Sequence, residues 1–265
     1  MNLIRMGTIT MLPHLLDLPW WGYALYALGV TQLTIACVTL YLHRAIAHQA
    51  VTFHPLVSHP MRFWLWLTTG MITREWVAVH RKHHAHADRE GDPHSPLNEG
   101  IWKMLFLGAV VYRRATQDEE ALAKYDKGCP DDWIERRLYQ RFRNFGVLLM
   151  LGINIALFGP AVGAAIWGVQ MAWIPFWAAG VINGAAHYLG YVNYRVKDNS
   201  RNLIPWALFI GGEELHNNHH RYLSSARFAV RPWEIDIGWI YIRVLAWLRL
   251  ARIRVVAPPL RASRA

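Results

Sequence analysis

The sequence predicts an all-α integral membrane protein with three to four transmembrane helices and a cytoplasmic helical cap. Three observations support this fold class. Hydrophobic residues make up 54% of the 265 positions and charged residues only 17%, a balance typical of membrane proteins. Long apolar runs alternate with charged segments along the chain. The net charge of +10 comes mostly from arginine and lysine outside the apolar runs, as the positive-inside bias predicts for a cytoplasmic face.

Three apolar runs are each long enough for a bilayer-crossing helix of roughly 20 residues. The runs are Trp20–Leu42, Gly146–Gln170 and Met171–Val192. We therefore expect membrane helices near residues 20–42, 146–169 and 171–192. Residues 6–19 are an alternative, partial membrane helix.

A fourth apolar run, Leu56–Ile72, is shorter and is interrupted by His59 and Arg62. The histidine groups described below can share one site only if an even number of crossings separates them. A single crossing by this run would place His48 and His80 on opposite sides of the membrane. We therefore expect the run to lie in the interface or to dip in without crossing.

The remaining residues, 43–55, 73–145 and 211–265, are expected to form the cap, so that residues 1–265 make one domain. The charged stretch Arg113–Asn144 predicts water-exposed helices and loops, with Asp131 or Asp132 as a helix N-cap. Ile237–Leu250 mixes apolar residues with arginines and predicts an interfacial amphipathic helix. The tail beyond residue 250 is expected to be loosely ordered.

Nine of the fourteen histidines fall into three tight groups and one outlier, each at the end of an apolar stretch. Ionisable side chains at membrane depth are costly, so a functional role is the default interpretation. Imidazole suits iron, zinc, copper and nickel, and nine imidazoles are close to what two metal ions need. The groups are His43 and His48; His80, His83 and His84; and His216, His219 and His220; the outlier is His187.

Helical geometry separates neighbours within the second and third groups. Adjacent residues point about 100° apart on a helix, so His83 and His84 can face different metal ions. His43 and His48 are about 140° apart on an ideal helix, so this pair would straddle a helix end or reach different ions. Asn183 and His187 are four residues apart and face the same way.

The residues beside these histidines suggest how the imidazoles are held. Asp88, Glu213 and Glu214 are natural acceptors for imidazole N–H groups. The carboxylate set of soluble di-iron bundles and the HExxH pattern of zinc proteases are missing. The other histidines are expected to be packed or hydrogen-bonded rather than metal-bound: His14, His54, His59, His86 and His94.

Three segments resemble the histidine boxes of membrane fatty acyl desaturases, the stearoyl-CoA desaturase type and its bacterial acyl-lipid relatives. These segments are Leu42-His-Arg-Ala-Ile-Ala-His48, Glu75-Trp-Val-Ala-Val-His-Arg-Lys-His-His84 and Gly212-Glu-Glu-Leu-His-Asn-Asn-His-His220. Asn183-Gly-Ala-Ala-His187 resembles the element that holds the family's ninth histidine and an asparagine that binds metal through water. The run Asp92-Pro-His-Ser-Pro96 is similar to the bacterial branch.

The resemblance implies two iron ions held by the nine histidines, with Asn183 acting through water and Trp76 beside the substrate tunnel. It implies a desaturase that uses dioxygen to place a cis double bond, at Δ9, in a saturated acyl chain carried on coenzyme A or in a phospholipid. It also implies a separate ferredoxin-like or cytochrome-like electron donor with its reductase, and a bacterial inner membrane with the active site facing the cytoplasm. Gly70 and Ala179 differ from the polar residues that animal members carry near the bend of the tunnel.

Two alternative functions stay open at the level of the sequence. A membrane di-iron hydroxylase of a lipid or alkane would use the same ligands but leave an alcohol. A metal transporter or metal-binding membrane protein would carry polar residues through the bilayer, whereas the run Gly146–Gln170 is apolar apart from Asn154 until its final glutamine. Nucleic-acid binding does not fit a chain with this much apolar sequence.

Overall fold

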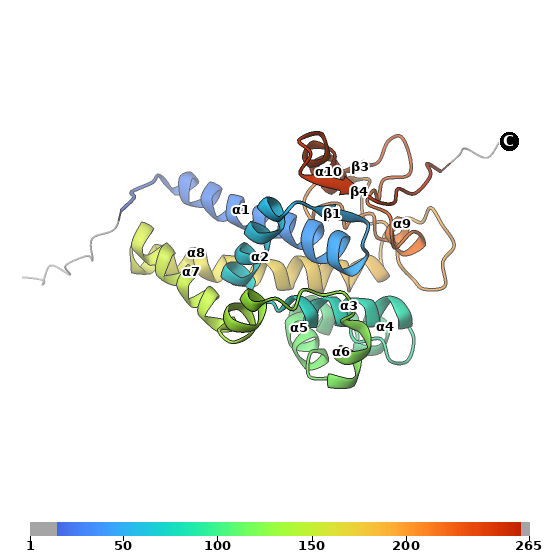
Figure 1. The fold of residues 1–265 in the computed structure, drawn as a ribbon, viewed down its shortest axis with the longest axis horizontal. Coiled ribbons are helices and arrows are strands. Elements are labelled where there is room, and N and C mark those ends of the chain that lie inside the picture. The colour runs from blue at the N-terminus through green and yellow to red at the C-terminus, as the bar shows by residue number, and fades with distance from the viewer. Residues whose placement is uncertain (1–14, 261–265) are drawn as a thin grey trace, which may run out of the picture.

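The computed structural model describes residues 15–260, and the predicted helix over residues 6–19 therefore lies mostly outside the described part, as does His14. Two long helices form the frame of the molecule, and shorter helices and loops collect at one end of it (Figure 1). Among the described residues, the helices Trp20–Ala47 and Pro160–His187 are long and apolar enough to cross a membrane. Arg143–Phe158 and Ile237–Trp247 are apolar but shorter.

The first long helix joins α1 (Trp20–Cys37) to a π-helical continuation, η1 (Val38–Ala47). Pro19 precedes the helix in an extended conformation, where its missing N–H group costs nothing. The helix continues past the predicted end at Leu42, so it carries His43 on a rigid element.

The second long helix is built from α8 (Pro160–Ile174), π-helical η3 (Pro175–Ile182) and the short turn η4 (Ala185–His187). It follows α7 (Arg143–Phe158), and the two pack side by side. The predicted helix boundary between Gln170 and Met171 is wrong, because the chain stays helical there. The break falls at Gly159, whose φ of 81° suits glycine, and the proline that follows begins α8.

The fourth apolar run forms α2 (Pro55–Thr69), which packs against α1 and α7. The His54 side chain caps its start by accepting a hydrogen bond from the backbone N–H of Leu56, and Gly70 ends it in the left-handed conformation. Arg62, which interrupts the apolar pattern, is buried and forms ion pairs with Asp132 and Glu135. The polar residue in this run therefore ties α2 to the charged segment of the cap.

The charged middle of the chain folds into short helices, as the sequence predicts. Asp132 accepts a hydrogen bond from the backbone N–H of Glu135 and so caps a helix start, while Asp118 caps α6. The charged stretch contains α6 (Glu119–Tyr125) and η2 (Glu135–Gln140). Before it lie α3 (Thr73–His86), α4 (Pro96–Glu99) and α5 (Ile101–Ala115).

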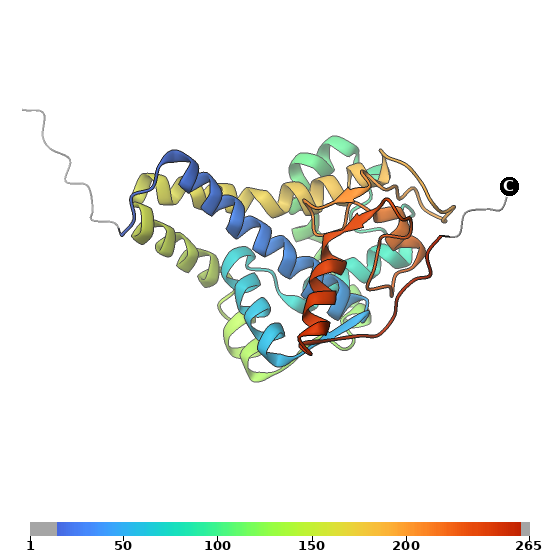
Figure 2. The same cartoon turned by 90° about the horizontal axis from the view of Figure 1, so that it is seen from above.

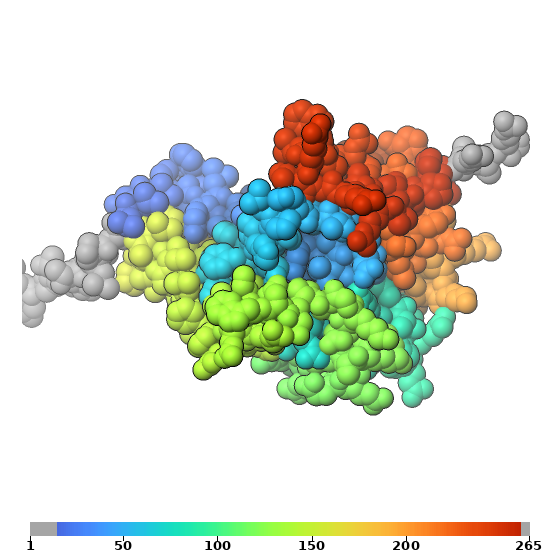
Figure 3. Space-filling model, viewed as in Figure 1, coloured from blue at the N-terminus to red at the C-terminus, as the bar shows by residue number. Residues whose placement is uncertain are grey.

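The C-terminal part folds back over the end of the first helix (Figure 3). The predicted amphipathic helix is present as α10 (Ile237–Trp247). The tail is more ordered than predicted: β4 (Ala251–Ile253) pairs antiparallel with β1 (Val51–Phe53). This pairing, together with the apolar cluster around the fully buried Ile242, is a long-range contact that the local pattern of the tail does not reveal. The second small sheet is a parallel pair, β2 (Trp206–Ala207) with β3 (Ile235–Asp236).

Residues 188–192, predicted to end the third membrane run, lie beyond the second long helix, and the prediction places residues 193–210 in neither the membrane nor the cap. They form a long connection between η4 and α9 (His216–Arg221), and Tyr191 and Leu215 both bridge to Asn202 within it. Seen from above in Figure 2, the histidine-bearing ends of η1, α3, η4 and α9 gather at the same end of the molecule.

One buried ion pair joins the first helix to the C-terminal part. Arg44 of η1 donates to Asp236, and both side chains are fully buried. Asp236 also accepts hydrogen bonds from the backbone N–H groups of Phe228 and Trp239, and Arg44 donates to the carbonyl oxygen of Ala226. Because burying a charge without a partner is costly, this network holds the C-terminal part in one position on η1.

Replacing Asp236 with Asn should destabilise the protein by about 3–5 kcal/mol, since the Arg44 guanidinium would remain buried without its charge partner. The measurement is the free energy of unfolding in detergent. Asp131→Asn is the matched control, because its partner Arg136 and Asp131 itself are 57% and 72% exposed. The control should cost less than about 1 kcal/mol. Equal effects of the two substitutions would contradict the assigned role.

Candidate metal centre

The structure brings all nine histidines together at the shared end of the two long helices. Five of them form one group, whose ring nitrogens lie within 4.8 Å of one another. The Nε2 atoms of His48 and His80 are 2.8 Å apart, and those of His43 and His219 are 3.1 Å apart. The members of this five-histidine group are His43, His48, His80, His84 and His219.

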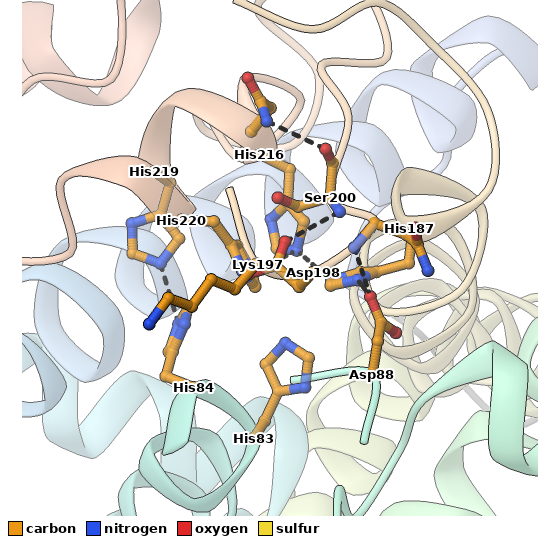
Figure 4. Close-up of polar contacts among 12 residues, drawn as sticks. His83, His84, Asp88, His187, Lys197, Asp198, Ser200, His216, His219 and His220 are labelled. Carbon is orange, nitrogen blue, oxygen red and sulfur yellow. Dashed lines mark hydrogen bonds and ion pairs between the residues drawn. The ribbon is translucent and has the colours of Figure 1, made fainter. Parts of the chain in front are cut away.

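The other four histidines form a second group next to the first, His83, His187, His216 and His220. The Nε2 atom of His216 lies 2.9 Å from that of His187 and 3.1 Å from that of His220 (Figure 4). The rings of His84 and His220, one from each group, have centroids 4.6 Å apart. The two groups are therefore adjacent.

The division between the groups follows helical geometry. Adjacent histidines fall on opposite sides: His83 and His84 belong to different groups, and so do His219 and His220. His43 lies inside η1 and His48 is its C-cap, so the pair straddles a helix end, as the first alternative predicts. The second alternative, different ions, is wrong, because both residues join the five-histidine group. The backbone N–H of His48 donates to the carbonyl oxygen of His43, the five-residue hydrogen bond of a π-helix, which brings residues five apart onto one face.

Four carboxylates contact imidazole rings on the side that faces away from the histidine groups. Each accepts a hydrogen bond from an Nδ1 atom, which leaves the Nε2 lone pair of that ring facing the group. The pairs are His43 with Glu213 at 2.7 Å, His187 with Asp88 at 2.7 Å, His83 with Asp92 at 3.0 Å, and His220 with Asp198 at 3.0 Å.

This arrangement agrees with two of the three predicted acceptors. Glu214 is the exception: its carboxylate accepts hydrogen bonds from the backbone N–H groups of Phe209, Ile210 and Gly212, and so it shapes the turn before α9. The other two acceptors, Asp92 and Asp198, are not among the predicted ones. Asp92 lies in the quoted Asp-Pro-His-Ser-Pro run, which was a usable signal, whereas Asp198 lies in a loop without a recognisable pattern.

The two asparagines between the histidines of the third group fix the loop that carries Asp198. Asn217 accepts hydrogen bonds from the backbone N–H groups of Asn193 and Tyr194 and donates to the carbonyl oxygen of Ser200. Asn218 donates to the carbonyl oxygen of Phe228 and to the carboxylate of Glu234. Both asparagines are buried, so each satisfies its amide with backbone or side-chain partners.

The arrangement fits metal ions. Imidazole nitrogens bind first-row metals at about 2.1 Å, so neighbouring ligands at right angles lie about 3 Å apart. The Nε2–Nε2 distances of 2.8 to 3.1 Å match this spacing. In addition, the Nε2 atom of His83 is buried without a hydrogen-bond partner among the described residues, while its Nδ1 faces Asp92. Lone pairs that face one another in a buried site repel unless a cation lies among them.

Burial also keeps these ligands in the protonation state that a metal requires. Desolvation, the largest cause, and the neighbouring imidazoles lower the pKa of several histidines well below its usual value, so their rings are neutral at pH 7. These histidines are His48, His80, His84, His216, His219 and His220.

A cavity of about 280 Å³ adjoins the histidines and extends between the helices. Its walls are mainly apolar, and His43, His80 and His216 reach it at one end. Asn183, four residues before His187, also lines it. This mainly apolar lining suits an apolar chain better than a polar metabolite.

Two further aromatic side chains, Trp76 and His94, line the cavity and stack on histidines of the two groups. Trp76 lines the cavity and stacks on His80 with ring centroids 4.8 Å apart. His94, expected to be an ordinary packed histidine, also lines the cavity and stacks on His83 at 4.5 Å. Both of its ring nitrogens are buried without partners among the described residues. Trp76 therefore lies beside a cavity, and His94 is packed, as expected, but also lines that cavity.

Comparison with known proteins identifies a family. A sequence model described as fatty acid desaturase matches residues 18–249. The chain is 32% identical over 219 residues to the sn-1 stearoyl-lipid 9-desaturase of Synechocystis sp., an alignment that covers 81% of this chain and 66% of that relative. It is 28% identical to the sn-1 stearoyl-lipid 9-desaturase of Anabaena variabilis, over 81% of this chain and 76% of the relative. It is 30% identical to Delta-9 acyl-lipid desaturase 1 of Arabidopsis thaliana, over 81% and 69%.

The metal-free protein should lose stability as the pH falls below about 6.5, the value at which histidines in the unfolded chain begin to take up protons. The folded state keeps these imidazoles neutral, so stability is fully present above that pH and is lost below it. The measurement is the unfolding free energy between pH 5 and pH 7.5. His84→Gln should flatten the dependence, whereas His59→Gln, an exposed site, should not. A stability that does not change over this range would contradict the assignment.

Asp198→Asn should weaken metal binding by between about tenfold and 100-fold, because the ring of His220 would lose its charged acceptor. The measurement is the metal content of purified protein equilibrated with increasing free Fe²⁺. Asp126→Asn is the control, since Asp126 pairs with Arg74 and not with an imidazole. Unchanged metal affinity in the Asp198 variant would show that the loop does not hold the site.

Proposed function

Because this chain belongs to the fatty acid desaturase family, we propose that it introduces a cis double bond at the Δ9 position of a saturated acyl chain. Family membership makes it an oxidoreductase that desaturates fatty acyl groups. The finer assignment rests on the relatives named as stearoyl-lipid 9-desaturases and on the cavity that ends at the histidines.

We assign the two histidine groups as ligands of two iron ions. The five-histidine group would hold one ion and the four-histidine group the other, with Asn183 completing the second set through a water molecule. When bound, such ions supply the dioxygen chemistry needed to remove hydrogen from an unactivated methylene, which acid–base side chains cannot do. The role of the protein is to fix the ligands. In four of the rings, a carboxylate keeps Nδ1 protonated and leaves Nε2 free to bind metal; the carboxylates are those of Asp88, Asp92, Asp198 and Glu213.

The cavity supplies positioning. A saturated chain is uniform, so only its placement can decide which two carbons react. The apolar walls would hold the chain and exclude water, and Trp76, stacked on His80, would form the wall nearest the ligands. Gly70 and Ala179 line the same cavity and leave space where a larger side chain would narrow it.

Electron balance requires a partner. Reduction of dioxygen to two water molecules takes four electrons, of which the two broken C–H bonds supply two. The other two must come from a separate donor, a ferredoxin-like or cytochrome-like protein served by a reductase. The net charge of +10 favours an acidic partner.

The membrane arrangement completes the proposal. We propose that α1 with η1, α7, and α8 with η3 are the membrane helices, that α2 lies in the interface without crossing, and that the cap faces the cytoplasm of a bacterial inner membrane. The two helices long enough to cross support this, as do the apolar surfaces of α1 and α7, where Leu25 and Leu148 are exposed. α7 is shorter, so the bilayer around it would need to be locally thinner.

Membranes that contain the protein should convert a stearoyl lipid to its Δ9 cis-monoenoic product only when iron, dioxygen and a competent donor are all supplied. His84→Ala and His220→Ala should each reduce turnover by at least about 100-fold, since each removes a ligand of one group. His59→Ala is the control at an exposed position. Mass spectrometry of the lipids locates the double bond.

The same experiment separates the alternatives. An alcohol in place of an alkene would support a hydroxylase with the same ligand set. Full turnover in the His84 or His220 variant, or the absence of any oxidised product with a competent donor present, would reject the proposed reaction.

A further inference from the structure

The cavity has a polar end, which the proposed reaction does not yet explain. It is formed where the first turn of α3, the last turn of α5 and the first turn of α7 meet, and it is lined by Glu75, Tyr112, Arg113 and Arg143. Arg143 and Glu75 form an ion pair there, so their charges offset each other. Arg113 is exposed and lies at the outer side.

Within the described part of the chain, the side chain of Tyr112 at this end of the cavity has an unpaired hydroxyl group. Its hydroxyl oxygen is buried, and among the described residues it has no hydrogen-bond partner. Burial raises the pKa of this phenol, so it remains a protonated donor at neutral pH. An unpaired buried hydroxyl is costly, and a phenylalanine would fill the same space without that cost. The hydroxyl is therefore expected to have a partner that enters the cavity.

The saturated substrate of the proposed function has one hydrogen-bond acceptor next to its apolar chain, the carbonyl oxygen of its ester or thioester. The apolar walls suit the methylenes, and the polar end suits that carbonyl. On α3, Glu75 at the polar end and His80 at the metal end are five residues apart, which corresponds to roughly 7.5 Å along the helix axis. This separation leaves room for several methylene groups between the two ends.

We propose that the Tyr112 hydroxyl donates a hydrogen bond to the carbonyl oxygen of the acyl ester or thioester, and that this contact sets which methylenes lie beside the histidines. The inference rests on the proposed function and makes Tyr112 a specificity-determining residue. The ion pair of Arg143 with Glu75 would frame the carbonyl without competing for it. Arg113 would face the phosphate that follows, whether of coenzyme A or of a phospholipid.

The test crosses two changes, Tyr112→Phe in the protein and loss of the carbonyl in the substrate. Vesicles carry either 1-stearoyl phospholipid or its 1-O-octadecyl ether analogue, and stearoyl-coenzyme A is the second ester arm. For the wild type, the ether should raise KM by roughly fivefold, the value of one neutral hydrogen bond, and should spread the double bond over neighbouring positions. Tyr112→Phe should show the same loss with the ester and no further loss with the ether. Whichever ester the wild type turns over, the phospholipid or the coenzyme A thioester, identifies the group that carries the acyl chain.

Tyr139→Phe is the matched control, because Tyr139 is buried in a separate cluster with Trp66 and Met150. A binding measurement keeps the inference independent of turnover: in the metal-free protein, the carrier ester should raise the melting temperature more than the ether does, and Tyr112→Phe should abolish the difference. If Tyr112→Phe keeps wild-type KM, double-bond position and ester preference in melting, the inference is overturned. If the wild type makes no alkene but the melting difference depends on Tyr112, the proposed reaction fails and the carbonyl contact stands.

Discussion

The structure depends on bringing nine imidazoles together in one largely buried space, where their ring nitrogens face one another. Four of the rings are oriented by the carboxylates of Asp88, Asp92, Asp198 and Glu213, which accept a hydrogen bond from Nδ1 and leave Nε2 facing the group. Without a cation, such facing lone pairs repel, and the same burial that lowers the pKa of the rings makes charging them costly. The arrangement is therefore favourable only when the imidazoles are neutral and a bound cation lies among their lone pairs.

Irregular helix geometry serves this requirement. The π-helical end of the first helix places His43 and His48 on one face, and the π-helical segment after Pro175 accommodates a proline inside a long helix that ends at His187. His187 itself lies on a short 3-10 turn, η4, just after the π-helical segment. π-helical turns are frequent at functional sites, which agrees with their place beside these histidines.

The remaining buried charges are paired and lie at the junctions between parts of the chain. Arg44 with Asp236 holds the C-terminal part on the first helix, and Arg62 with Glu135 and Asp132 ties α2 to the charged cap segment. These contacts fix the position of α9 relative to η1, so the third histidine group meets the first. The cavity, by contrast, has mainly apolar walls, as expected of a site that must hold a uniform chain in register.

The sequence by itself determined the long apolar helices, the nine histidines and the separation of neighbours such as His83 and His84, because these follow from local composition and from the period of a helix. It also determined the family, through motifs that are local as well. Only the tertiary structure decided that His43 and His48 share a group, that Asp198 rather than Glu214 supports an imidazole, and that the tail pairs with β1. The reason is physical: these outcomes depend on a switch in helix type and on contacts between residues far apart in the chain, and neither leaves a periodic trace in the amino-acid order.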